Sequence, residues 1–138
     1  MRLSLLLAVL LVAILFTAGV IKADEDRDIK LLIDKLIKEN DVMVFSKSYC
    51  PYCSRAKNLL KKLQVKRLDV LELDHLADGF EIQSELSERS GQRTVPSIWI
   101  KGKFFGGSSD LLEAHQNGSL QKLFEQGDVE FTDFKDEL

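Results

Sequence analysis

The sequence predicts an α/β fold in which a mixed central sheet of four strands carries helices on both faces. Short apolar runs alternate with segments of helical periodicity, which is typical of strands joined by helical crossovers. The last two apolar runs lie only a turn apart, which is typical of a hairpin. The chain has 138 residues, of which 45% are hydrophobic and 30% charged. That is enough for one core and too little for two domains.

The predicted elements follow the order α β α β α β β α α. The first helix places Ile29, Ile33 and Leu36 on one face, and the first strand is the apolar run before Ser46. Gly102 marks the turn of the hairpin. The strands are expected at 42–45, 68–73, 95–100 and 104–105, and the helices at 29–37, from Pro51 to before Val65, from about Phe80 to near Gly91, and at 111–115 and 120–124.

The N-terminal segment lies outside this pattern. From Leu3 to Ile21 the chain carries no charge, with Arg2 before the run and Lys22 after it. Such a segment is typical of a secretory signal peptide, here residues 1–23. Its 19 residues are also long enough for an uncleaved membrane anchor, the one case in which a membrane is expected as a partner. In both cases Arg2 directs the rest of the chain across the membrane.

The last four residues, Lys135-Asp136-Glu137-Leu138, match the address for retrieval to the endoplasmic reticulum. The two ends together predict a protein of the endoplasmic reticulum lumen that engages a retrieval receptor through 135–138. They leave residues 24–134 as the folded domain. The net charge is −3, and no basic patch is present in the sequence, so nucleic acid is not an expected partner.

The chemistry concentrates at Cys50-Pro51-Tyr52-Cys53, where the first strand gives way to a helix. Pro51 suits the first turn of a helix, and the free amides and dipole there favour a thiolate on Cys50. Lys47 adds a positive charge, whereas Cys53 lies deeper in the turn and is expected to be more covered. This asymmetry predicts thiol–disulfide exchange in which Cys50 attacks and Cys53 resolves the mixed disulfide.

Three other readings of the two cysteines are open. A structural disulfide would close a two-residue loop, which constrains the unfolded chain little. A closed zinc site needs four ligands, and the only histidines, His75 and His115, match no zinc-finger spacing, so no metal is expected. Both thiols could also be inert. The C-x-x-C pattern beside alternating strands and helices favours the redox reading.

Three blocks of the sequence resemble dithiol glutaredoxins, members of the thioredoxin superfamily. F-S-K-S-Y-C-P-Y-C at 45–53 resembles their active-site segment, G-Q-R-T-V-P at 91–96 their T-V-P loop, and G-G-S-S-D at 106–110 their G-G-x-x-D turn. The blocks come in family order, and the resemblance covers roughly residues 29–126. It implies a thioredoxin-like three-layer sandwich, with glutathione as co-substrate. Tyr52 separates the motif from the usual thioredoxin and disulfide-isomerase pattern.

The resemblance also implies a glutathione site. Cationic side chains of the site would hold the glycyl carboxylate of glutathione, and the main chain of Val95 would pair with its cysteinyl backbone. The start of a helix would hold its γ-glutamyl group. A cis Val95–Pro96 bond, as in the superfamily, would leave the Val95 backbone free for this pairing. Taken singly, Lys47 and Arg93 could be surface charges and Asp110 a helix-start residue. The implied set is Lys47, Tyr52, Gln83, Arg93, Thr94, Val95, Pro96, Ser109 and Asp110.

The leading hypothesis is a glutathione-dependent thiol–disulfide oxidoreductase that acts on luminal client proteins, on their glutathione mixed disulfides and their disulfides. Glutaredoxin potentials of about −200 to −230 mV, against about −180 to −210 mV in this compartment, predict a pair that rests largely oxidised. Two alternatives are a glutaredoxin-fold binding module with silent thiols and an isomerase-like helper without glutathione preference. A shared iron–sulfur cluster is a further option, against which Pro51 argues because the family's cluster binders usually lack this proline.

Overall fold

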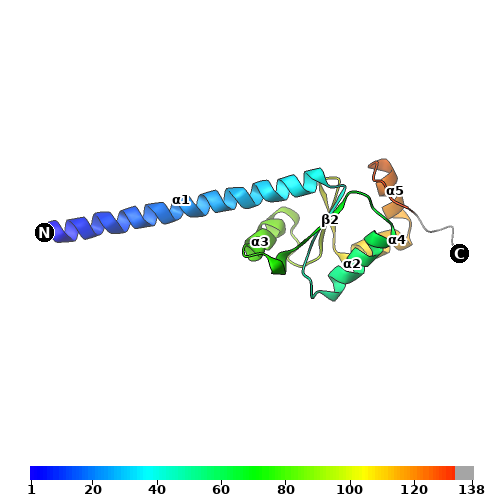
Figure 1. Ribbon diagram of the computed structural model, residues 1–138, viewed down its shortest axis with the longest axis horizontal. Coiled ribbons are helices and arrows are strands. Elements are labelled where there is room, and N and C mark those ends of the chain that lie inside the picture. The colour runs from blue at the N-terminus through cyan, green and yellow to red at the C-terminus, as the bar shows by residue number, and fades with distance from the viewer. Residues whose placement is uncertain (133–138) are drawn as a thin grey trace.

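Four strands form one mixed sheet at the centre of the protein (Figure 1). The computed structural model describes residues 1–132, so the predicted signal at 135–138 lies outside the described residues. The sheet order is β2-β1-β3-β4, with β1 parallel to β2, antiparallel to β3, and β3 antiparallel to β4. The predicted mixed sheet with a closing hairpin is therefore confirmed. The strands are β1 (Val42–Ser46), β2 (Leu68–Glu72), β3 (Ser97–Ile100) and β4 (Lys103–Gly106).

Helices cover both faces of the sheet, which gives three layers (Figure 1). Successive residues of β1 point to opposite faces. Val42 and Val44 pack in the core formed with α2, α4 and α5, whereas Met43 and Phe45 pack in the core formed with α1 and α3. The helices are α1 (Arg2–Glu39), α2 (Pro51–Lys62), α3 (Gly79–Ser90), α4 (Ser108–Gln116) and α5 (Ser119–Gln126), with a 3₁₀ turn η1 (Leu73–His75) after β2.

The first helix is much longer than the predicted 29–37, because it begins at Arg2 and continues without a break to Glu39. Only Ile29 and Ile33 of this helix are buried, and the apolar run before them projects away from the sheet (Figure 1). By length and composition this helix could cross a membrane, and a signal sequence near an N-terminus meets the same criterion. The structure therefore leaves both readings of the segment open.

The third strand begins two residues later than predicted, at Ser97 instead of Val95. Pro96 has no N–H to donate to a ladder, so the strand starts after it. The predicted cis Val95–Pro96 bond is confirmed.

The register brings the segments that carry chemistry to one end of the sheet. Ser46 pairs with Glu72, Phe45 with Ser97, and Ile98 with Gly106. The C-x-x-C segment, the turn after β2, the loop before β3 and the turn after β4 therefore start or finish at the same end, which we call the redox end.

Candidate active site

Cys50 is the N-cap residue of α2, with Pro51 in the first turn, as the sequence predicts. The backbone amide of Cys53 donates a hydrogen bond to the Cys50 sulfur at 3.3 Å. Cys50 is half-buried, and its thiol donates to the Val95 carbonyl at 3.8 Å. An amide directed at the sulfur and the positive end of a helix both stabilise negative charge on Cys50.

Cys53 lies in the opposite environment, with 0% of its surface exposed. Burial, together with its hydrogen bond to Cys50, raises the pKa of the Cys53 thiol to about 11. Hydrogen bonds from the Lys47 backbone and the Ser46 hydroxyl act against this rise. At neutral pH Cys53 is therefore a protonated, covered thiol beside a more accessible one, and both are free in the structure.

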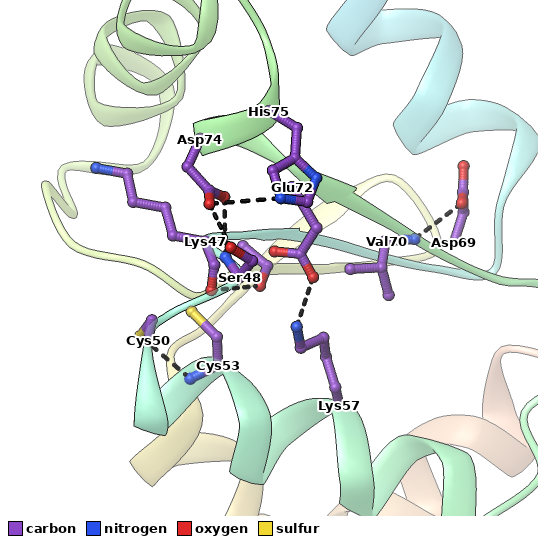
Figure 2. Close-up of polar contacts among 11 residues, drawn as sticks. Lys47, Ser48, Cys50, Cys53, Lys57, Asp69, Val70, Glu72, Asp74 and His75 are labelled. Carbon is purple, nitrogen blue, oxygen red and sulfur yellow. Dashed lines mark hydrogen bonds and ion pairs between the residues drawn. The ribbon is translucent and has the colours of Figure 1, made fainter.

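The turn before Cys50 is held by a carboxylate from η1, the turn that follows β2 (Figure 2). One Asp74 oxygen accepts from the Ser48 amide at 2.8 Å, and the other accepts from the Ser48 hydroxyl. These bonds, the hydroxyl first, keep the pKa of Asp74 below its usual value. The Cys50 amide in turn donates to the Lys47 carbonyl at 3.1 Å. Asp74 therefore fixes the turn that places both Lys47 and Cys50.

A second carboxylate at the end of β2 reaches the helix that carries Cys53. Glu72 and Lys57 point toward one another across the space between β2 and α2 (Figure 2), and their charged atoms lie 2.5 Å apart. Both side chains are mostly buried, with 22% and 16% of their surface exposed. Lys57 lies one helical turn after Cys53, so the pair anchors α2 next to Cys53.

A groove of about 340 Å³ runs beside Cys50, along the cis-proline loop and the start of α4. One wall is formed by Val95, whose carbonyl contacts the Cys50 thiol. The structure gathers six of the nine residues of the implied glutathione set along this groove: Tyr52, Thr94, Val95, Pro96, Ser109 and Asp110.

Comparisons with known proteins agree with this geometry. The Glutaredoxin family model matches residues 42–105. Glutaredoxin-1 of Rhizophagus irregularis is 52% identical over 95 residues, which cover 69% of this chain and 93% of the relative. This chain belongs to the glutaredoxin family. Glutaredoxin-1 of Saccharomyces cerevisiae is 48% identical over 96 residues, 67% of this chain and 87% of the relative.

A solved structure shows the same fold for this glutaredoxin. The crystal structure of a buckwheat glutaredoxin–glutathione complex matches with a TM-score of 0.71 at 37% identity, covering 77% of this chain and 96% of that chain. The predicted thioredoxin-like sandwich is therefore confirmed. Because glutaredoxins are thiol–disulfide oxidoreductases, the chain is an enzyme of this class.

Three residues of the implied glutathione set do not line the groove: Lys47, Gln83 and Arg93. Gln83 donates its side-chain amide to the Arg93 carbonyl at 3.0 Å, so these two lie together. Lys47 is half-exposed in the turn before Cys50. Within the groove, Asp110 accepts from the Gly107 amide at 2.8 Å, which is the contact of a helix start.

The structure also shows residues of this glutaredoxin's site that the sequence did not single out. Gln92 lines the groove and donates from one nitrogen to the carbonyls of Thr94 and Pro96, each at 3.0 Å. Ser108 lines the groove as well, and its buried hydroxyl has no hydrogen-bond partner within residues 1–132. Gln92 stands inside the G-Q-R-T-V-P block, so the motif held a signal for it. Ser48 stands inside the block at 45–53 in the same way, whereas no pattern in the sequence indicated Asp74 or Glu72.

Proposed function

We propose that this glutaredoxin uses glutathione to exchange protein–glutathione mixed disulfides and protein disulfides, with Cys50 as nucleophile and Cys53 as resolving thiol. The observation that carries this proposal is the contrast between the two sulfurs. Cys50 stands at a helix start beside an open groove, whereas Cys53 is covered and protonated. The buckwheat complex with glutathione supports the choice of co-substrate.

In the first step the Cys50 thiolate attacks the glutathione sulfur of a mixed disulfide. The Cys50–glutathione bond forms, the client–glutathione bond breaks, and the client thiolate takes up a proton from water. Two routes then free Cys50. A second glutathione thiolate attacks the glutathione sulfur, which releases glutathione disulfide, or Cys53 attacks Cys50, which releases glutathione and leaves the intramolecular disulfide.

The groove supplies places for the parts of glutathione. The Val95 backbone would pair with the cysteinyl unit, while the free amides at the start of α4, beside Ser109 and Asp110, would receive the γ-glutamyl carboxylate. Asp110 can meet the ammonium group with the oxygen that does not cap the helix. We assign the glycyl carboxylate to Lys47, Gln83 and Arg93, and the remaining walls to Tyr52, Thr94 and Pro96.

The test is turnover of a glutathionylated peptide, coupled to glutathione reductase, by the detergent-solubilised full chain and by two variants. We expect Cys50→Ser to be inactive and Cys53→Ser to retain turnover, because the first route needs one thiol. Loss of activity in both variants would restrict the enzyme to client disulfides. An inactive unmodified chain would instead support the binding module with silent thiols.

A second assay separates this proposal from an isomerase-like helper. Substituting Lys47 or Arg93 by Met removes a cation proposed to hold the glycyl carboxylate, and an exposed charge-assisted contact is worth about 1 kcal/mol. We therefore expect the KM for the glutathionylated peptide to rise about fivefold, with less change for a peptide disulfide. Equal effects on both substrates would show that these cations give the enzyme no preference for glutathione, which would favour the isomerase-like helper.

We propose the endoplasmic reticulum lumen as the location, from the apolar segment at 3–21 and the K-D-E-L tetrapeptide at 135–138. Whether the segment is cleaved or anchors the protein is decided by the mass of the cellular protein. The sequence holds one N-x-S/T glycosylation acceptor, Asn117-Gly118-Ser119, and Asn117 is exposed. Protection of the domain from protease in intact microsomes, and a glycan absent in Asn117→Gln, would support luminal entry. A protease-sensitive domain would contradict it.

A further inference from the structure

The end of the sheet that carries Cys50 also carries most of the exposed apolar side chains of the folded domain. Within residues 40–132 the structure exposes five large apolar or aromatic side chains: Tyr49, Tyr52, Leu76, Phe80 and Leu123. The first four belong to segments that meet at the redox end, whereas the fifth lies on α5. Single apolar residues scattered over a surface need no explanation, but a group gathered at one site indicates a binding surface.

Two of these side chains stand next to residues that are in direct contact. Ser48 donates its amide and its hydroxyl to Asp74, which joins the turn before Cys50 to η1 (Figure 2). Tyr49 directly follows Ser48, and Leu76 is the C-cap of η1, two residues after Asp74. Tyr49 is also the residue directly before Cys50, and 72% of its surface is exposed. An apolar surface therefore borders Cys50 on the side where η1 lies.

Phe80 extends this surface along the start of α3. The Gly79 amide donates to the Leu76 carbonyl at 3.3 Å, and a side chain at Gly79 would collide with the Leu73 carbonyl oxygen, so α3 begins pressed against η1. Phe80 borders α1 across a groove of about 500 Å³, yet it is 81% exposed, so α1 does not cover it. Gln83 lies one helical turn after Phe80 on the same face, next to the proposed position of the glycyl carboxylate.

We propose that Tyr49, Leu76 and Phe80, which we call the apolar rim, bind the client chain beside its reacting cysteine. This inference rests on the proposed function, because it concerns the protein part of the same substrates. The client sulfur is either bonded to Cys50 or one sulfur atom further away, and a disulfide bond is about 2 Å long. The chain on both sides of the client cysteine must therefore lie on the surface around Cys50, which continues from the groove onto the apolar rim.

The chemistry of the apolar rim selects clients that have not finished folding. Apolar residues beside a cysteine are usually buried in a folded protein and are exposed while the chain is unfolded. Their contact with the apolar rim removes apolar surface of both partners from water, which gives affinity without a requirement for one particular sequence. The occupant is thus an extended client segment with apolar side chains next to its cysteine.

The first test measures this preference. Two glutathionylated peptides differ only in the residues that flank their cysteine, which are leucine and valine in one peptide and serine and glutamine in the other. In the assay coupled to glutathione reductase, the detergent-solubilised full chain should show a kcat/KM about fivefold higher for the apolar peptide. Phe80→Gln and Leu76→Gln should each remove most of this preference. Cysteine–glutathione disulfide, which has no flanking chain, should be turned over as before.

The control is Leu123→Gln on α5, because Leu123 and Leu76 are exposed to nearly the same extent, 38% and 37%. Each variant is compared with the unmodified chain on the same peptide in the same detergent, so partition of the peptide into micelles cancels. A preference that persists in both rim variants would overturn the proposal. An equal loss with cysteine–glutathione disulfide would overturn it too, since the substitutions would then disturb Cys50 itself.

A second measurement detects contact with the apolar rim without relying on turnover. In a chain with Cys53→Ser and Phe80→Trp, Cys50 attacks the sulfur of a peptide supplied as its mixed disulfide with thionitrobenzoate. The Cys50–peptide bond forms, the peptide–thionitrobenzoate bond breaks, and thionitrobenzoate leaves as a coloured thiolate. We expect the tryptophan emission to shift to shorter wavelength with the apolar peptide and to stay unchanged with the polar one. Trp99, which is 6% exposed, contributes a constant background.

The remaining outcomes separate the two proposals. If the apolar peptide is trapped on Cys50 and the emission does not shift, the apolar rim is not the client surface, while the proposed function stands. If the unmodified chain turns over neither the glutathionylated peptides nor cysteine–glutathione disulfide, the proposed function fails and the role of the apolar rim fails with it.

Discussion

The two ends of the central sheet each bury a carboxylate, and they treat it differently. At the end where β1 begins, Asp41 is only 4% exposed, and one of its carboxylate oxygens, Oδ1, contacts two cations. Its carboxylate contacts Lys101 at 3.0 Å and Arg67 at 3.4 Å, its amide donates to the Arg67 carbonyl, and its carbonyl accepts from the Lys101 amide. At the redox end, Glu72 has one partner for two oxygens.

The difference extends beyond these two residues. Within residues 1–132, the two buried side-chain atoms without a hydrogen-bond partner are Glu72 Oε2 and the Ser108 hydroxyl, and both lie at the redox end. An end that only holds strands together is most stable when every polar group is paired. An end that binds a substrate can keep polar groups that gain a hydrogen-bond partner only when the substrate is bound. The contrast predicts that substitutions at the first end change stability alone, whereas those at the redox end also change catalysis.

The largest expected effect at the redox end is a loss of stability in alkali, caused by Cys53. Its pKa is raised from 9.0 to about 11, so the stability that the neutral buried thiol contributes is fully present below pH 9 and is lost as pH rises through about 11. Two pKa units correspond to about 3 kcal/mol. Urea unfolding of the reduced protein should show this loss between pH 8 and pH 11, and Cys53→Ser should not. Parallel pH profiles for the two proteins would contradict the burial of an ionisable thiol here.

The next largest effect is a loss of stability at the opposite end of the sheet, where β1 begins. Asp41→Ala removes the carboxylate shared by Lys101 and Arg67, two partly exposed cations that water can then solvate. We expect the free energy of unfolding to fall by about 2 kcal/mol, less than for a pair buried on both sides. The KM and kcat for the glutathionylated peptide should be unchanged below the unfolding transition. A change in KM would show that Asp41 influences the groove. It would contradict the prediction that substitutions at this end change stability alone.

A smaller effect is expected where Asp74 holds the turn before Cys50. Asp74→Asn and Ser48→Ala each disrupt the bonds between these residues, and each should lower kcat/KM about tenfold because the turn places both Lys47 and Cys50. The double variant should lose no more than Asp74→Asn alone, because the hydroxyl that Ser48→Ala removes has Asp74 as its partner, while the Ser48 amide is present in every variant. Additive losses would mean that the two residues act separately.

How much of the fold and of the candidate site the sequence predicts depends on how far apart in the chain the contacting residues lie. The run 42–45 has no polar residue because β1 is buried on both faces, and its prediction as a buried strand is confirmed. The cis bond before Pro96 and the cap of α2 at Cys50 lie within short motifs and were predicted too. The true extent of α1 was missed, because its apolar half and its packed half were read as separate segments.

The contacts that organise the redox end could not be predicted in this way. Ser48 and Asp74 are 26 residues apart, and Lys57 and Glu72 are 15 apart. Each pair meets only because β1 and β2 run parallel in one particular register, and a shift by one residue would turn Glu72 to the other face. Periodicity indicates that a strand exists, but the register also depends on its neighbours.

The smallest effect concerns Gln92, whose side chain joins the carbonyls on either side of Val95. Gln92→Met keeps the length of the side chain and removes both bonds, so the loop should lose part of its order while Cys50 is untouched. We expect the KM for the glutathionylated peptide to rise about threefold with kcat unchanged, which is under 1 kcal/mol of binding. The same change at the exposed Gln126 of α5 is the control. A fall in kcat with constant KM would show that Gln92 affects the chemical step instead of substrate binding. The groove would then not be the part of the redox end that binds glutathione.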